Sequence, residues 1–341
     1  MKRNPADLTV SEAGVALRSG ALSSVGLTQA HLARIAARNP SIKAFVHIGA
    51  DDALAHAHAA DLAFANGTDT GGSVGSPAAY CGVVGLKPTF GAISLAGVMP
   101  LAPALDHVGP IARTVAEAET VVAALMSVPQ AACADIAGMR IAYGRNWCVD
   151  KDASHNLAEL MDNAASTFSL YGACLFLTDL PAYNAIEDAA ARIILAGEYA
   201  THGSTVEAWP DAIGKSAAAS ILSGRQISAQ KLHQAKQALS EFGVIIDALL
   251  AEYNVLILPT TMTTAPPFRA FADGKTIWTA MRTLPFNVTG HPALSLPVGF
   301  CDGLPLGMQI IGRRGDEVGI CRVGAAFEAA TVHSAGDPCF A

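Results

Sequence analysis

The sequence predicts an α/β fold, a mixed and mostly buried β-sheet flanked by helices. Hydrophobic residues make up 51% of the 341 positions and charged residues only 15%, below the roughly 25% of an average globular domain. A strand–helix–strand pattern between residues 140 and 177 indicates parallel strands with a right-handed crossover. Since no internal repeat interrupts these patterns, we expect one domain over residues 1–341.

The first 65 residues predict helices. Thr9 and Glu12 form a capping box that opens a short helix, which Gly20 closes. Ser24 can cap a second helix, which should stop before Asn39-Pro40. The alanine-rich run 51–64 predicts a third helix.

Residues 67–110 have a different composition. They hold nine glycines and five prolines among short apolar groups, which suits buried strands joined by tight turns. The alternative is a flexible low-complexity segment. The near absence of charge and the dispersed Val, Leu and Ile residues favour the strands.

The rest of the chain alternates between the two element types. Thr114 and Glu117 form a second capping box, with a helix to about Met126. The remaining predicted strands are 140–144, 173–177, 253–259, 293–298 and 307–311, and the remaining helices are 157–170, most of 185–250, and 317–330. The last two strands can form a hairpin across Asp302-Gly303.

Composition excludes several classes of function. A net charge of −7 without a Lys/Arg cluster argues against nucleic-acid binding. Glycine and proline interrupt the uncharged stretch 88–105, so a membrane helix is not expected. Seven irregularly spaced cysteines without a CxxC pair favour reduced thiols in a cytoplasmic protein and predict neither a metal site nor a cofactor.

The stretch 67–73, GTDTGGS, carries the chemical signal. It places Ser73 behind Gly71 and Gly72 in a nearly uncharged region. A serine held there can act as a nucleophile, with unobstructed backbone N–H groups beside it to receive an oxyanion. Gly71 to Gly75 also fits the G-x-S-x-G nucleophile elbow. That elbow needs an entering strand and a leaving helix. Residues 61–70 do not predict a buried strand, and Ser76-Pro77 does not continue a helix smoothly.

A longer pattern resembles the amidase signature family. Residues 67–113, GTDTGGSVGSPAAYCGVVGLKPTFGAISLAGVMPLAPALDHVGPIAR, are similar to its signature. The N-terminal helices, NVLILPTT and FNVTGHPALSLPVGFCDGLPLGMQIIGRRGDE follow in the family's order, so the resemblance covers nearly the whole chain. It implies hydrolysis or transfer of an amide, with Ser73 as nucleophile and the N–H groups of Thr70, Gly71 and Gly72 as the oxyanion hole.

The resemblance also implies two residues that this chain lacks. Family members carry a catalytic lysine and a bridging serine before the GTDTGGS element, whereas here Asn66 runs directly into Gly67. We therefore expect a segment of roughly one hundred residues to be absent between an N-terminal helical part (1–66) and the signature loop and core (67–341). The family usually has arginine where Gly75 stands, so Asp69 is expected to lack a charged partner.

Other residues could be mistaken for catalytic ones. We expect Lys87, His107 and Gln309 to have structural roles and Cys81 to be a small buried core residue. Asp106 and His107 are adjacent, so they cannot easily serve as the acid and base of one triad. The pair His56 and His58 is expected to lie on a helix face rather than to bind a metal.

Two interpretations of function therefore stand side by side. The first is an amidase-type hydrolase that acts on a small-molecule amide and is impaired by the missing residues. The second is a non-catalytic amidase remnant, or a protein that only binds a partner. A homo-oligomer or amidotransferase-type partner subunits are compatible with both interpretations.

Overall fold

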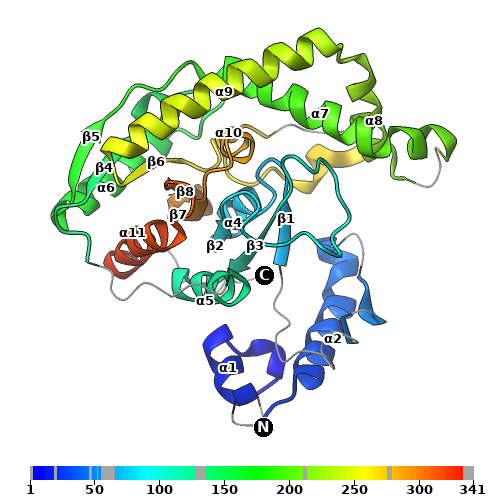
Figure 1. The fold of residues 1–341 in the computed structure, drawn as a ribbon. Helices are drawn as coiled ribbons and strands as arrows, with labels where there is room; N and C mark the ends of the chain where they lie inside the picture. Colours follow the sequence, from blue (N-terminus) through cyan, green and yellow to red (C-terminus); the bar gives the residue numbers. More distant parts are fainter. Residues whose placement is uncertain are drawn as a thin grey trace. The chain divides into compact units, whose positions relative to one another are not determined.

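The computed structural model describes residues 3–18, 21–45, 48–51, 53–54, 66–126, 135–209, 213–274 and 279–332. The chain separates into two compact units, residues 1–65 and 66–341 (Figure 1). The predicted third helix over 51–64 and the pair His56 and His58 lie almost entirely or wholly outside the described residues. No helix in the described ranges is long and apolar enough to span a membrane.

The first unit is helical, with η1 (Pro5–Asp7), α1 (Val10–Arg18) and α2 (Ser24–Ile42). The capping box at α1 is confirmed, because the Thr9 N–H donates to Glu12 (2.8 Å) and the Glu12 N–H donates to the Thr9 hydroxyl (3.2 Å). Arg34 of α2 forms an ion pair with Asp7 and donates to the Ala6 carbonyl, which joins α2 to η1.

Two details of α2 differ from the sequence expectation. The capping side chain is Ser23, whose hydroxyl accepts from the Gly26 N–H at 3.0 Å, and Ser24 is the first helical residue. The predicted stop before Asn39-Pro40 is wrong, because the helix continues through Pro40 to Ile42. The Asn39 side chain accepts from the N–H of Phe45 and donates to its carbonyl, so it provides hydrogen-bond partners for the backbone beyond the helix.

The second unit is built on an eight-stranded sheet of order β1-β3-β2-β7-β8-β6-β4-β5. Its strands are β1 (Asn66–Asp69), β2 (Val84–Lys87), β3 (His107–Ala112), β4 (Arg140–Tyr143), β5 (Cys174–Leu177), β6 (Val255–Pro259), β7 (Ala293–Cys301) and β8 (Leu304–Ile311). β4 runs parallel to β5 and β6, and the other pairs are antiparallel. The predicted mixed sheet and the β4–β5 crossover are confirmed.

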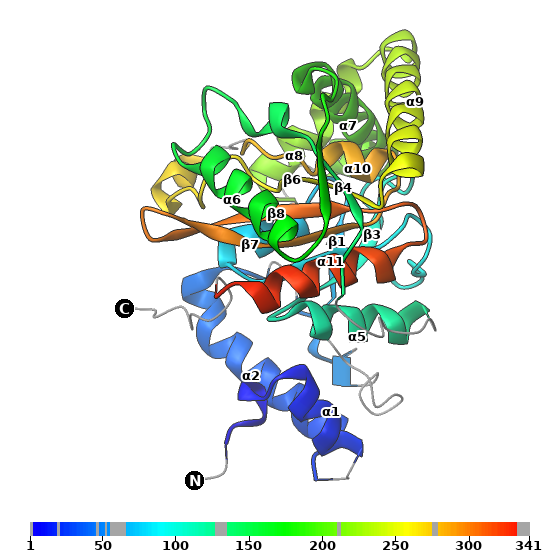
Figure 2. The same ribbon diagram turned by 90° about the vertical axis from the view of Figure 1, so that its left-hand side faces the viewer.

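Helices cover both faces of this sheet (Figure 2). The helices are α4 (Gly75–Cys81), α5 (Val115–Met126), α6 (Leu157–Leu170), α7 (Tyr183–Ala208), α8 (Lys215–Ser223), α9 (Ala229–Glu252), α10 (Leu284–Val288) and α11 (Glu317–Ala330). One apolar core lies between the sheet and α5, α6 and α11, and a second lies between the sheet and α7, α9 and α10. This layering buries both faces of the central strands, as their apolar runs require.

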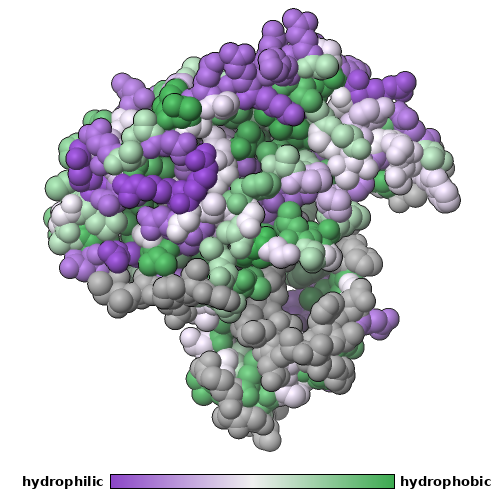
Figure 3. All heavy atoms as spheres, in the orientation of Figure 1, coloured by the Kyte–Doolittle hydropathy of each residue, from purple (hydrophilic) through white to green (hydrophobic). Residues whose placement is uncertain are grey.

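The outer helices turn polar side chains to solvent. Hydrophilic residues gather along α9 at the top of Figure 3, on the side away from the sheet. The inner side of α9 carries fully buried apolar residues, including Phe242 and Ile246. This division is typical of a helix that covers one face of a buried sheet.

Candidate active site

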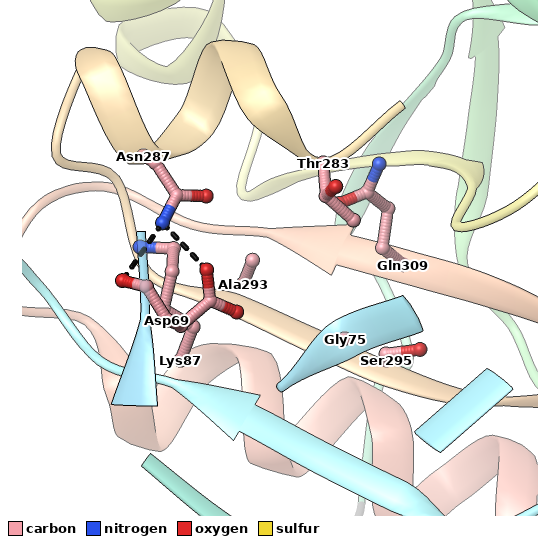
Figure 4. Close-up of a pocket in the computed structure, with 8 residues that line it drawn as sticks. All are labelled: Asp69, Gly75, Lys87, Thr283, Asn287, Ala293, Ser295 and Gln309. Atoms are coloured by element: carbon pink, nitrogen blue, oxygen red, sulfur yellow. Dashed lines mark hydrogen bonds between the residues drawn. The ribbon is translucent and has the colours of Figure 1, made fainter. Parts of the chain in front are cut away.

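The signature loop begins where β1 ends, and Asp69 shapes it. The Asp69 carboxylate is 1% exposed and accepts from the backbone N–H groups of Gly72 (2.6 Å) and Val74 (2.7 Å). The Asn287 amide of α10 donates to the same carboxylate at 2.6 Å (Figure 4). The loop therefore curls around one buried anion, which charge-assisted hydrogen bonds hold in place.

Lys87 lies beside Asp69 in the same pocket (Figure 4). Its ammonium donates to the carbonyls of His291 (2.7 Å) and Pro88 (3.2 Å). Burial lowers the pKa of Lys87 to about 8, although the negative charges of Asp69 and Glu317 oppose that shift. Among the described residues Asp69 forms no ion pair, as expected, although the charge of Lys87, 18 positions along the chain, acts on it through the fold.

The two loop glycines are required by close packing. An added Cβ on Gly71 would lie 2.9 Å from Ile194 Cδ1, and one on Gly72 would lie 2.1 Å from Thr283 Oγ1. Gly72 also has a φ of +130°, which residues with a Cβ rarely adopt. The Thr283 hydroxyl donates to the Gly71 carbonyl at 2.9 Å, so the loop is clamped from the α10 side.

Ser73 projects from this anchored loop and is exposed, next to the fully buried Val74. Among the described residues, none forms a hydrogen bond with the Ser73 hydroxyl. The Gly72 N–H already donates to Asp69, while the Gly71 N–H has no partner in the described part of the chain. The Ser73 hydroxyl is therefore free on a rigid turn. Of the three N–H groups proposed for the oxyanion hole, that of Gly72 is already engaged by Asp69.

The loop leads directly into a helix that the sequence did not predict. α4 begins at Gly75 and runs through Pro77, because proline in the first turn removes an N–H that has no intrahelical acceptor. The expectation that no helix leaves the turn is therefore wrong. β1 is likewise a strand, but the expectation that no buried strand enters the turn holds, because Thr68 is exposed and β1 lies at the edge of the sheet.

The acid and histidine of that rival triad are engaged elsewhere. Asp106 accepts from the Thr70 hydroxyl at 2.7 Å and from the N–H groups of Leu101 and Ala102. His107 Nδ1 lies 2.6 Å from the Leu105 carbonyl, and its ring packs edge-on against Phe90. Burial lowers the pKa of His107 to about 3, so it is a neutral packing residue at pH 7.

Two further candidates have clear positions. Gln309 is buried and donates to the carbonyls of Pro259 (3.0 Å) and Arg282 (2.8 Å), which supports a structural role. Cys81 is exposed at the end of α4, so the prediction of a buried core residue is wrong. Ala78 and Ala79 take the inward positions of that short helix, and Cys81 shares the exposed side with Pro77. Desolvation by the surrounding protein raises the pKa of the Cys81 thiol, so it is not activated.

A small pocket lies between the loop and the sheet. Eight residues line it: Asp69, Gly75, Lys87, Thr283, Asn287, Ala293, Ser295 and Gln309 (Figure 4). It has room for about one water molecule, far below the several hundred Å³ of a typical ligand site. Asn287 and Thr283, which hold the loop from α10, were missed by the sequence reasoning because nothing in their local pattern connects them to a loop more than two hundred positions away.

Sequences of known proteins match this chain over most of its length. The family model described as Amidase matches residues 60–321. The A-type subunit of the glutamyl-tRNA(Gln) amidotransferase from Exiguobacterium sibiricum is 33% identical over 337 aligned positions, which cover 86% of this chain and 70% of the relative.

Solved structures share the fold. The corresponding amidotransferase protein from Thermotoga maritima is 26% identical with a TM-score of 0.63, and the match covers 77% of this chain and 61% of that one. This chain therefore spans less than two thirds of that structure's length. A chain from a vestigial protein complex, described as revealing the evolutionary origins of an s-triazine catabolic enzyme, has a TM-score of 0.78 at 20% identity, covering 94% of this chain and 98% of that one. Sequence, family and fold together show that this chain belongs to the amidase signature family.

Proposed function

We propose that this protein is an amidase-type hydrolase of carbon–nitrogen amide bonds, with Ser73 as the residue that forms the acyl-enzyme. The observation that carries the proposal is an exposed serine on a turn whose backbone is held by Asp69, Asn287 and Thr283. Such preorganised N–H groups stabilise the oxyanion of a small-molecule amide substrate. Thr70 and Gly71 carry most of that role, since the Gly72 N–H must leave Asp69 before it can contribute.

We further propose that this activity is impaired. Lys87 donates to backbone carbonyls and His107 Nδ1 lies against the Leu105 carbonyl. No described residue forms a hydrogen bond with the Ser73 hydroxyl. A serine without a base is a poor nucleophile, and losing the base costs on the order of 10⁴-fold in rate. The Exiguobacterium alignment runs over 337 positions but covers 86% of this chain, about 293 residues, so about 44 positions are gaps in this chain. That number is smaller than the segment of roughly one hundred residues that we propose to be absent.

The second candidate is a non-catalytic amidase remnant or a partner-binding protein. The unpartnered Ser73 hydroxyl favours it, as do the names of the relatives, each of which is one subunit of an amidotransferase. On this interpretation the chain is a cytoplasmic protein that binds amidotransferase-type partner subunits or a second copy of itself. An α/β-hydrolase mechanism is less well supported, since the Asp106 carboxylate is engaged by other groups and His107 Nδ1 lies against the Leu105 carbonyl. The buried His107 Nε2 has no hydrogen-bond partner among the described residues, Ser73 included.

A fluorophosphonate probe separates the two candidates, because it labels only a folded and activated serine. The proposal predicts slow labelling of the wild type and none of Ser73→Ala. Ser169→Ala, a change of an exposed serine on α6, is the matched control and should label like the wild type. No labelling of a chain that unfolds cooperatively would favour the non-catalytic interpretation, and labelling of Ser73→Ala would remove Ser73 from the mechanism.

The proposed absence of a segment has a separate test. Sequencing the gene across the codons of Asn66 and Gly67 shows whether the locus encodes further residues there. An encoded segment with lysine and serine would make the present sequence an incomplete copy of an active enzyme. An uninterrupted junction would make the impairment a property of the natural protein.

A further inference from the structure

Three side chains of metal-ligand type meet where β7 ends and α6 begins. The ligand atoms of His155, Cys301 and Asp302 all lie within 4.8 Å of one another. His155 and Cys301 are 146 positions apart in the sequence, so their irregular spacing gave no sign of a metal site. The sequence predicts no metal site, whereas these three described residues form a group that could hold a metal ion.

The distances match the geometry of a tetrahedral ion. Cys301 Sγ lies 3.5 Å from His155 Nδ1 and 3.8 Å from Asp302 Oδ2. Zinc bonds of about 2.3 Å to sulfur and 2.0–2.2 Å to nitrogen or oxygen place two tetrahedral ligands about 3.6 Å apart. Both measured separations are close to this ligand-to-ligand distance. The exposed Asp302 carboxylate can rotate to adjust the third separation, between its oxygen and His155 Nδ1.

The scaffold holds the ligands from two directions. The Asn156 amide donates to the Phe300 carbonyl at 2.9 Å, which ties the residue after His155 to the residue before Cys301. An irregularity in the β7–β8 register between Pro297 and Gly299 redirects the end of β7. An added Cβ on Gly299 would lie 2.6 Å from Leu160 Cδ2, so this strand end packs directly against α6 (Figure 2).

From this arrangement we propose a zinc site formed by His155 Nδ1, Cys301 Sγ and one Asp302 carboxylate oxygen. Sulfur, nitrogen and oxygen donors select zinc-like transition ions and disfavour Mg²⁺ and Ca²⁺, which prefer oxygen alone. The thiolate and the carboxylate together neutralise a divalent charge. Because His155 and Asp302 are exposed while Cys301 is buried, the fourth position faces solvent and takes water. The bound ion would cross-link the β7–β8 hairpin to the start of α6, away from the signature loop.

Cobalt(II) is the probe for this site, because sulfur-to-cobalt charge transfer reports the thiolate ligand directly. Titration of the chelator-treated full chain should produce this absorption with saturation at one equivalent, and Zn²⁺ should remove it. Cys301→Ser should abolish the band. His155→Ala and Asp302→Asn should each weaken cobalt binding by at least about tenfold.

The matched control is Cys174→Ser, which removes an exposed cysteine on β5 and should leave the band unchanged. Since His155 is exposed, His155→Ala keeps the test valid even where Cys301→Ser does not fold. A thiolate band that persists in Cys301→Ser, or one indifferent to His155→Ala, would overturn the proposal in favour of adventitious thiols. Absence of the band in the wild type would also overturn it and leave Cys301 and His155 as an ordinary thiol–imidazole contact.

Discussion

The two ends of the signature loop, Asp69 and Ser73, differ in almost every physical respect. Asp69 is buried and bonded to two backbone N–H groups and the Asn287 amide, while the charge of Lys87 acts on it. Ser73 is exposed and has no hydrogen-bond partner among the described residues. The difference shows that the chain contains the buried carboxylate and the donors that shape the loop. The groups that would activate the serine are what we propose to be missing.

Removing the Asp69 carboxylate should have the largest effect on the free energy of unfolding. Asp69→Ala leaves the buried N–H groups of Gly72 and Val74 without an acceptor and removes one of the two negative charges that act on Lys87. We expect the free energy of unfolding to fall by roughly 3–5 kcal/mol, measured by urea denaturation. Asp152→Ala, with a carboxylate that is 65% exposed, is the control and should change stability by less than about 0.5 kcal/mol. Equal effects of the two changes would mean that Asp69 does not organise the loop.

Adding a side chain at Gly72 should have the next largest effect on stability. Gly72→Ala adds a Cβ at 2.1 Å from Thr283 Oγ1 and keeps a φ of +130°. Backbone strain and overpacking together should cost about 4 kcal/mol. Gly91→Ala is the matched control, because Gly91 also has a positive φ but no atom within 4 Å of the added Cβ. A similar loss of thermal stability in both variants would show that strain alone acts and that the Thr283 clamp is unimportant.

The buried Lys87 side chain should make the free energy of unfolding depend on pH. Its folded pKa of about 8 lies below the ordinary 10.5. Between those values the unfolded chain binds more protons than the folded one. The contribution of Lys87 to stability is therefore lost as pH falls through about 8 and gained as pH rises to about 10.5. Over this range the wild type should gain at most about 3 kcal/mol relative to Lys87→Met.

Urea denaturation of both proteins at pH 7.5 to 10.5 measures this difference. Taking the difference cancels the thiols and phenols that also titrate there. Lys231→Met, a change of an exposed lysine on α9, should follow the wild type at every pH. A difference between wild type and Lys87→Met that does not vary with pH would place the Lys87 pKa near its ordinary value.

Much of the fold was predictable because local rules act alone in those segments. The Asp302-Gly303 turn has positive φ at both residues and joins β7 to β8, as the dipeptide indicates. The helix predicted over 317–330 is confirmed as α11, with Asp316 capping it through the Gly319 N–H. In contrast, α4 was missed because Pro77 was interpreted as a breaker although it stands in the first turn.

The site was less predictable because its supports are distant. The resemblance placed Ser73 on a glycine loop, but the partner of Asp69 is Asn287, 218 positions away. Lys87 was expected to be structural, and its hydrogen bonds support that role. Its proximity to Asp69 depends on pairing of β2 with β3 and of β3 with β1, which no local pattern encodes.

The smallest effect should come from the serine itself. The Ser73 hydroxyl is exposed and unbonded, so Ser73→Ala should change the free energy of unfolding by less than about 0.5 kcal/mol. Ser228→Ala is the contrasting change, because the Ser228 hydroxyl caps α9 by accepting from the Lys231 N–H, and its loss should cost about 1 kcal/mol. Thermal denaturation of both variants measures this contrast. A destabilisation by Ser73→Ala that matches the cap variant would show that Ser73 supports the loop. An unchanged stability means that any loss of fluorophosphonate labelling reports chemistry rather than unfolding, because the loop that Asp69 shapes does not depend on the residue it presents.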